Sequence, residues 1–194
     1  WDPSGGILLA HRCLSGVQSR FRALGGRFRT GRVVAVDSDE RSGSRVSMRS
    51  SINGSTETER FDQVVVTAGP WTSKLLPQLT SILQSVSTPV TYWRDPSGAY
   101  SAANGCPILF NARLTDMYAL PSCEYPGLVK VLYHGGPEVD PDTRDVGALA
   151  PYITRASDYV REHLPRADHE QPAIVEPCMY TMTPDGAPII ARLD

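Results

Sequence analysis

The sequence lacks the features that would place it in a membrane, on a nucleic acid or around a metal. Its 194 residues contain no apolar run of about 18 residues, so we expect no membrane span. The formal net charge of −2 leaves no excess of positive charge for a nucleic acid or an anionic surface. The four cysteines lie far apart without a Cys-x-x-Cys pair, which disfavours a metal or dithiol site and indicates a reducing compartment.

Two features of complete nucleotide-binding proteins are also missing. The chain has no Gly-x-Gly-x-x-Gly turn, which would hold a pyrophosphate at a helix N-terminus. It begins at Trp1 without an initiating Met or a signal peptide, and it stops shortly after Pro188-Ile189-Ile190. We therefore expect the chain to be a piece of a longer protein.

The first part of the chain predicts one helix and a small antiparallel meander. Apolar residues recur at helical spacing from Leu14 to Leu24, which predicts an amphipathic helix over 11–24 that Gly25-Gly26 ends. Strand-like runs follow at 32–36 and 45–49, each bounded by turns rich in Ser, Gly and Asn.

A continuous apolar run, Val64–Val66, differs from these alternating strands. Such a run is typical of a strand covered on both faces, as in a parallel sheet. The small residues Thr67-Ala68-Gly69 after it let the backbone approach a ligand or form a tight turn, and Pro70 can begin a helix over 71–76.

From Pro89 onward, short apolar runs separated by Pro and Gly loops predict an antiparallel sheet with one helix. Strands are expected at 90–93, 108–110, 117–120, 128–133 and 173–181. The helix is expected over 151–164, because Pro151 can open it and Pro165 follows its end. The whole pattern predicts an α/β fold of the α+β type.

Several runs carry a family resemblance along essentially the whole chain. The most specific is Cys-Met-Tyr-Thr-Met-Thr-Pro-Asp at 178–185, and the others lie at 4–8, 64–72, 120–134 and 139–145. In order and spacing they resemble the sarcosine oxidase and pipecolate oxidase family, including its peroxisomal members. That family belongs to the D-amino-acid-oxidase-like flavoproteins.

The resemblance implies the central part of a two-domain flavoprotein. Residues 1–80 would be part of the FAD-binding domain, with its helix, meander and buried strand. Residues 81–177 would form the antiparallel-sheet substrate domain with flanking helices, and residues 178–194 would return to the FAD domain with the flavin-attachment motif. Since the dinucleotide turn and the C-terminal segment of the family are absent, this chain alone should be inactive and should not bind FAD tightly.

Cys178 is the first candidate site residue. Attack of a thiolate on a flavin needs a cysteine held rigidly beside the ring, and a strand ending in a Thr-Pro-Asp turn can supply that rigidity. The alternative is an inert buried cysteine in a strand. The resemblance implies that Cys178 binds FAD covalently in the full-length protein.

Lys130 and His134 are four residues apart in a predicted strand, which would place both on one face. A buried ammonium is costly unless a negative or polar group uses it; the alternative is an edge strand with Lys130 in water. The resemblance implies that Lys130 promotes the reaction of reduced flavin with O2, and that His134, Tyr118 and Tyr180 line the substrate pocket. For the tyrosines the alternative is plain core.

Four further residues match positions that approach the adenosine and pyrophosphate part of FAD in the family. They are Val33, Ala68, Gly69 and Trp71. For Ala68-Gly69 the alternative is a simple tight turn.

The function implied is that of an FAD-dependent amine oxidase. It would oxidise sarcosine, pipecolate or a similar secondary amino acid to an imine by hydride transfer to the flavin, with O2 reduced to H2O2. One alternative is a non-catalytic fragment or degenerate paralogue acting as a binding or scaffold domain; another is an oxidase of other N-alkyl or glycated amino acids. We expect a monomer in full-length form, without nucleic-acid or membrane partners, and a peroxisomal or cytoplasmic location.

Overall fold

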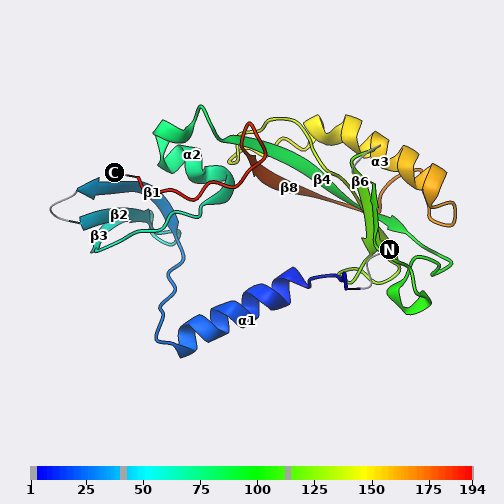
Figure 1. The fold of residues 1–194 in the computed structure, drawn as a ribbon, viewed down its shortest axis with the longest axis horizontal. Helices are drawn as coiled ribbons and strands as arrows, with labels where there is room; N and C mark the ends of the chain where they lie inside the picture. Colours follow the sequence, from blue (N-terminus) through cyan, green and yellow to red (C-terminus); the bar gives the residue numbers. More distant parts are fainter. Residues whose placement is uncertain (1–3, 40–42, 112–114, 194) are drawn as a thin grey trace. The chain divides into compact units, whose positions relative to one another are not determined.

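A computed structural model describes residues 4–39, 43–111 and 115–193 (Figure 1). It divides into two compact units, the first made of Trp1–Ala68, Thr72–Thr80 and Pro188–Asp194, the second of Gly69–Trp71 and Ser81–Ala187. The expected mixture of helices and antiparallel sheets, an α+β fold, is confirmed.

The first unit begins with the predicted helix, α1 (Ala10–Ala23). Its end is a Schellman motif: Gly26 N donates to Phe21 O at 3.0 Å and Gly25 N to Arg22 O at 2.9 Å, with Gly25 at φ +88°. The apolar stripe of α1 is largely exposed, with Val17 and Leu24 each 68% exposed. The structure describes every residue of α1, and none of them is buried.

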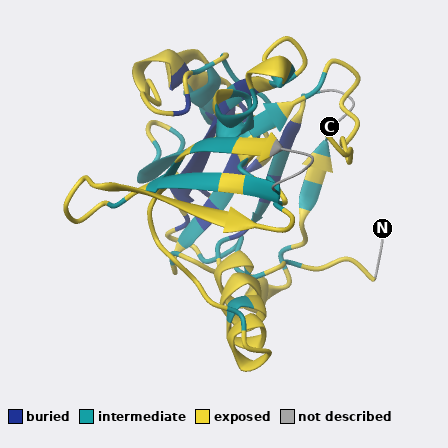
Figure 2. Ribbon diagram, turned by 90° about the vertical axis from the view of Figure 1, so that its left-hand side faces the viewer, coloured by how far each residue is buried: buried dark blue, intermediate teal, exposed yellow. Residues whose placement is uncertain are grey.

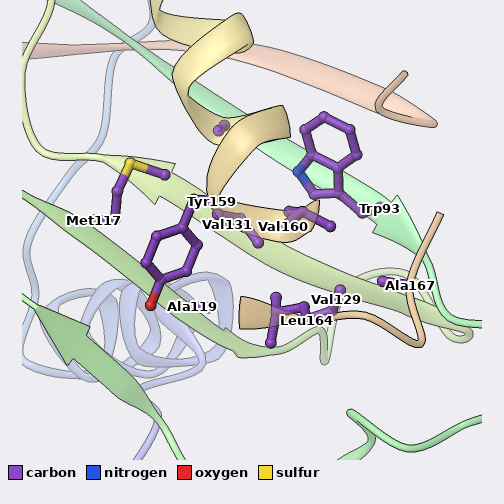
Figure 3. Packing of buried hydrophobic residues seen from close by; sticks show 10 residues of the cluster. Trp93, Met117, Ala119, Val129, Val131, Tyr159, Val160, Leu164 and Ala167 are labelled. Atoms are coloured by element: carbon purple, nitrogen blue, oxygen red, sulfur yellow. The ribbon is translucent and has the colours of Figure 1, made fainter. Parts of the chain in front are cut away.

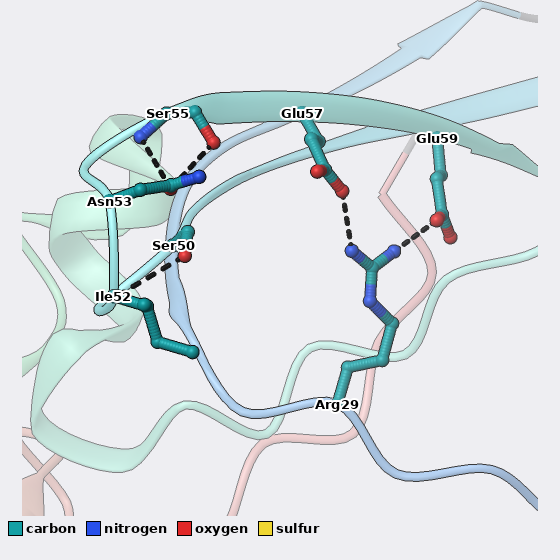
Figure 4. A network of polar contacts seen from close by, with 7 residues as sticks. All are labelled: Arg29, Ser50, Ile52, Asn53, Ser55, Glu57 and Glu59. Carbon is teal, nitrogen blue, oxygen red and sulfur yellow. Dashed lines mark hydrogen bonds and ion pairs between the residues drawn. The ribbon is translucent and has the colours of Figure 1, made fainter.

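Three antiparallel strands follow in the order β1-β2-β3. They are β1 (Arg32–Asp39), β2 (Gly43–Arg49) and β3 (Thr56–Phe61). The sequence pattern does not predict β3, because its six residues are all exposed and mostly polar. Arg29 forms ion pairs with Glu57 and Glu59, which lie on one face of β3 (Figure 4).

The predicted buried strand at Val64–Val66 is wrong for this structure. Residues 63–68 have no regular secondary structure, and Val65 is 85% exposed. A strand of that composition needs neighbours that cover both faces, and no strand of the described residues pairs with it. The predicted helix over 71–76 is shorter than expected and consists of a 3-10 turn, η1 (Gly69–Trp71), and α2 (Thr72–Leu75), with a further turn, η2 (Pro77–Leu79).

The second unit is a five-stranded antiparallel sheet with one long helix, as predicted, and its strand order is β5-β6-β7-β4-β8. Its strands are β4 (Gln84–Arg94), β5 (Leu109–Asn111), β6 (Met117–Pro121), β7 (Leu128–Tyr133) and β8 (Ile174–Met182). Its helices are α3 (Ala150–His163) and the turns η3 (Ala102–Asn104) and η4 (Gly147–Leu149). Strand β4, which lies between β7 and β8, begins earlier than predicted, because its first residues are mostly polar.

The core lies where α3 packs on one face of this sheet (Figure 3). Trp93, Val129 and Val131 point to this face, and Val160 and Leu164 meet them from α3 and its end. Buried residues gather in this sheet and along α3, whereas α1 and β3 are exposed (Figure 2). The side chains of β4 and β7 that alternate with the core residues therefore point to the opposite face.

The ladder between β4 and β7 stops at a proline. It runs from Arg94 to Val90, and the next residue of β4, Pro89, lies opposite Pro177 of β8 and has no N–H to donate. Beyond Pro89 the segment after β7 replaces the strand, since Ser87 N donates to Pro137 O at 2.9 Å. Gly136 lies directly against this bond, because a Cβ added there would be 1.6 Å from Ser87 O.

No helix among the described residues is both long and apolar enough to cross a membrane.

Candidate functional site

The candidate site is the face of the five-stranded sheet that α3 does not cover. Glu176, Cys178 and Tyr180 alternate along β8 and so point to the same face. In the register, Val90 of β4 lies opposite both Glu176 of β8 and Leu132 of β7. The other even-numbered side chains of β7, and those of β6 opposite them, belong to this face as well.

Cys178 is exposed on this face and forms no disulfide. Partial desolvation by neighbouring side chains raises the pKa of the Cys178 thiol, and the charge of Glu176 raises it further. Lys130 and Arg144 act in the opposite direction but do not reverse the shift. Exposure does not fit the alternative of an inert core cysteine, and the thiol is accessible to a planar group lying on the sheet.

Aromatic rings gather on the face to which Cys178 belongs. Tyr180 Oη lies 3.3 Å from His134 Nδ1, and their ring centroids are 5.2 Å apart. Tyr118 lies edge-on to His134 at 6.4 Å and to Phe110 at 6.1 Å. Desolvation, followed by a hydrogen bond with Tyr180, raises the pKa of Tyr118, so its hydroxyl stays protonated and can act as a donor. Tyr118 and Tyr180 are both half-buried, and Tyr118 packs against the buried cluster of Val90, Tyr92 and Leu132.

The expectation that Lys130 and His134 share one strand is wrong in detail. β7 ends at Tyr133, and His134 is an exposed residue whose backbone N donates to Asp116 O at 2.7 Å. The backbone ladder between β7 and β4 stops at Pro89, which has no N–H, and beyond it the Thr88 hydroxyl donates to Tyr133 O at 2.8 Å. His134 still reaches the site through its contacts with Tyr118 and Tyr180.

Lys130 is a half-buried cation within the sheet. Its ammonium lies 2.8 Å from Glu124 Oε1 and 5.3 Å from the centre of the Tyr92 ring, and its side chain is 18% exposed. Since β7 lies between β6 and β4, the alternative of an edge strand with Lys130 in water does not hold. Burial acts to raise the pKa of the Glu124 carboxyl, but the hydrogen bond and charge of Lys130, with backbone donors, lower it overall.

Glu176 and its two tyrosine partners were not among the predicted site residues. Tyr125 Oη donates to Glu176 Oε1 at 2.5 Å, and Tyr92 Oη donates to Glu176 Oε2 at 3.1 Å. The two rings meet edge-to-face at 4.8 Å. The strand period could have indicated Glu176, because it lies two residues before Cys178 and must share its face.

Of the predicted cofactor residues, Gly69 and Trp71 lie in the same unit as Cys178. Trp71 Nε1 donates to Asp142 Oδ1 at 2.9 Å, and the Arg144 guanidinium lies 5.5 Å from the Trp71 ring centre. Gly69 has φ +53°, a conformation that favours glycine. Val33, half-buried in β1, and Ala68 belong to the first unit.

The side chains on the face that α3 does not cover fit the ring end of a flavin better than its phosphates. This face presents the exposed residue Cys178, aromatic side chains and the half-buried Lys130 next to the buried cluster of Val90, Tyr92 and Leu132. No glycine-rich turn at a helix N-terminus, the usual pyrophosphate site, occurs among the residues that the structure describes.

Comparison with known proteins agrees with this chemistry. Residues 1–194 match the family described as "FAD dependent oxidoreductase". The chain is 37% identical over 200 residues to peroxisomal sarcosine oxidase of Homo sapiens, covering 98% of this chain and 49% of that protein. It is 28% identical over 193 residues to monomeric sarcosine oxidase of Bacillus sp. (strain NS-129), covering 95% and 47% respectively. It thus spans about half the length of these relatives.

Solved structures share the fold at low sequence identity. Fructosamine oxidase (Amadoriase II) from Aspergillus fumigatus has a TM-score of 0.66 at 16% identity, covering 89% of this chain and 43% of that one. NikD, an unusual amino acid oxidase essential for nikkomycin biosynthesis, has a TM-score of 0.61 at 20% identity, covering 88% and 44%. From the family match over its full length and its sarcosine oxidase relatives, the chain belongs to the FAD-dependent oxidoreductase family.

Proposed function

We propose that this chain is part of an amine oxidase that oxidises sarcosine, pipecolate or a similar secondary amino acid, with O2 as electron acceptor and H2O2 as product. The single observation that carries the proposal is the open sheet face, where Cys178, the His134–Tyr180 pair and Lys130 lie together. The family match supplies FAD as the cofactor. When bound, FAD would accept a hydride, that is two electrons and one proton, from the amine, and O2 would take these together with the second proton that the amine releases to give H2O2.

Cys178 is the residue we assign to covalent attachment of the flavin. Cys178 is an exposed residue. It lies in the middle of the nine residue pairs between β8 and β4, so its position is fixed. The raised pKa of the Cys178 thiol means that it is mainly protonated in the free protein at neutral pH. Attachment therefore requires a base or a bound positive group to favour the thiolate.

Lys130 is assigned to the oxygen reaction. A fixed positive charge stabilises negative charge that develops on O2 as it is reduced. The Lys130 side chain is only 18% exposed and points to the same face as Cys178, so water screens its charge less than that of a surface lysine. Its electrostatic effect on Cys178 supports its placement near the attachment point.

His134, Tyr118 and Tyr180 are assigned to the substrate pocket. The aromatic rings exclude water on one side, and the His134–Tyr180 contact of 3.3 Å orients the imidazole. The Tyr118 hydroxyl, whose pKa is raised by desolvation and by its hydrogen bond with Tyr180, is assigned as a donor to a substrate oxygen. On the adenosine and pyrophosphate side, we assign Val33, Ala68, Gly69 and Trp71 to contacts with the cofactor.

The domain boundaries, location and oligomeric state form part of the same proposal. We assign residues 1–80 and 178–194 to the FAD domain of the whole protein and residues 81–177 to its substrate domain. The peroxisomal names of the human and mouse relatives favour a peroxisomal location. The name of the Bacillus relative favours a monomer.

The test uses the full-length protein purified from its own source. We expect a yellow protein whose flavin remains bound after denaturation, with the added mass on the peptide that contains Cys178. Addition of sarcosine or pipecolate should release H2O2, and Cys178→Ser should abolish covalent attachment. A colourless protein with a free Cys178 thiol and no amine-dependent H2O2 would refute the proposal and favour the non-catalytic binding domain.

A further inference from the structure

The loop Ser122–Gly127, which joins β6 to β7, has a defined shape at the edge of the candidate site. Tyr125 N donates to Ser122 Oγ at 2.9 Å, and Leu128 N donates to Tyr125 O at 3.2 Å. The far end is attached to β4, because Asp95 N donates to Gly127 O at 2.9 Å. The loop therefore presents its two middle residues, Glu124 and Tyr125, in a fixed orientation.

These two adjacent residues contact two different groups of the site face. Glu124 Oε1 pairs with the Lys130 ammonium at 2.8 Å, while Tyr125 Oη donates to Glu176 Oε1 at 2.5 Å. Glu176 is held from the other side by Tyr92 Oη at 3.1 Å. The loop is thus connected to β7 by an ion pair and to β8 by a charge-assisted hydrogen bond. Such a bond is stronger than a hydrogen bond between two neutral groups.

A lysine side chain has four rotatable bonds, and without a partner its ammonium samples many positions. Here the ammonium is held between the Glu124 carboxylate and the Tyr92 ring, whose centre is 5.3 Å away. Tyr92 is itself 1% exposed and fixed by its bond to Glu176. The Glu176 carboxylate, which anchors the loop through Tyr125, therefore also fixes the Tyr92 ring beneath Lys130.

We propose that Glu124 is a positioning residue for Lys130, and that the Tyr125–Glu176 hydrogen bond holds Glu124 in place for this task. The inference rests on the proposed function, because it assigns to Glu124 the placement of the cation that promotes the oxygen reaction. Glu124 touches neither substrate nor oxygen in this assignment. Its role is to keep one ammonium in one place.

The first experiment measures the position of Lys130 without using activity. Lys74 and Lys130 are the two lysines of the sequence, and Lys74 on α2 serves as the internal reference. The full-length protein is treated briefly with N-hydroxysuccinimidyl acetate, and acetylation of each lysine is followed by peptide mass spectrometry. In Glu124→Ala, and to a smaller degree in Tyr125→Phe, Lys130 should be acetylated about two- to fivefold faster relative to Lys74, as expected for loss of a partly exposed ion pair.

The second experiment separates the two half-reactions of the flavin-loaded protein by stopped flow. Glu124→Ala should slow reoxidation by O2 about ten- to a hundredfold, the cost of a small misplacement of a working group. Reduction by amine in the absence of O2 should stay within about twofold of wild type. Glu124→Gln, which retains an oxygen acceptor for the ammonium, should recover most of the reoxidation rate. Glu170→Ala, a carboxylate whose side chain is 91% exposed, is the matched control.

The outcomes separate the inference from the proposed function. Unchanged Lys130 acetylation in Glu124→Ala and Tyr125→Phe overturns the inference, even if the enzyme is an amine oxidase. Faster reoxidation in both Glu124 variants also overturns it, because the carboxylate would then act only as a counter-charge. A wild-type protein without flavin refutes the proposed function, and the acetylation rates then still decide the contact. If Glu124→Ala fails to fold, Tyr125→Phe decides it by the same measurement.

Discussion

Replacement of Glu176 by Gln should make Cys178 a better nucleophile in the flavin-free protein. The two residues are separated by two positions in β8, so their side chains lie about 6.7 Å apart along the strand. At an effective dielectric constant of about 40 to 80, suitable for an exposed thiol, loss of one negative charge at that distance is worth roughly 0.6 to 1.2 kcal/mol. The pKa of the Cys178 thiol should therefore fall by about half to one unit.

The effect on rate is smaller than the effect on the thiolate population. A lower thiol pKa reduces the intrinsic nucleophilicity of the thiolate, with a Brønsted coefficient of about 0.4 to 0.5. The net gain in alkylation rate at pH 7 should then be about two- to threefold. Glutamine keeps the size of the side chain and one oxygen acceptor. The hydrogen bonds from Tyr92 and Tyr125 are therefore weakened but not both lost.

The assay follows alkylation by iodoacetamide with peptide mass spectrometry over pH 6 to 10. Cys13, exposed on α1 of the first unit, provides the internal reference in each sample. Glu170→Gln removes a carboxylate elsewhere in the second unit and should leave Cys178 unchanged. A Cys178 titration that does not move in Glu176→Gln would refute the electrostatic reasoning, and an upward shift would refute it equally.

Three further changes test the structure itself. Gly136→Ala should lower the free energy of unfolding by about 2 kcal/mol or more, because its Cβ would collide with Ser87 O; an unchanged urea midpoint would contradict the close approach. Leu164→Ala, at a side chain 1% exposed, should cost about 2 to 5 kcal/mol in the same urea assay, and a cost below about 1 kcal/mol would contradict its place in the core. The stability contribution of the Lys130–Glu124 pair should be present above the unfolded pKa of Glu, about 4.3, and lost as pH falls through the lowered folded pKa. Urea titrations of wild type and Glu124→Gln should therefore differ at pH 6 and converge near pH 3; a constant difference would contradict the pair.

The sheet of the second unit could be predicted because its strands obey the period of two. Residues 128–133 alternate between the α3 face and the open face, and the predicted bounds of β7 agree with the structure. Local pattern fails where burial depends on neighbours. Val64–Val66 is apolar throughout but has no strand beside it among the described residues, and it is not a strand.

For the candidate site, the sequence led to the reactive side chains but not to their partners. Lys130, His134 and Cys178 stood out from motifs and from strand spacing. Glu124 and Glu176 did not, because their importance arises from contacts across the sheet and from a loop whose conformation is not periodic. The pairing of Lys130 with Glu124 also answers a question that the sequence raised, namely which negative group accompanies a half-buried ammonium.

The all-polar edge strand β3 has a consequence for self-association. An edge strand offers unpaired backbone groups to which a strand of another molecule can add. In β3, every side chain is exposed, and Glu57 and Glu59 already share the guanidinium of Arg29. A second copy added in parallel and in register would bring its own Glu57 and Glu59 beside these, without a free cation from Arg29 to offset them. The polar composition of β3 therefore disfavours growth of the sheet by parallel, in-register addition at this edge.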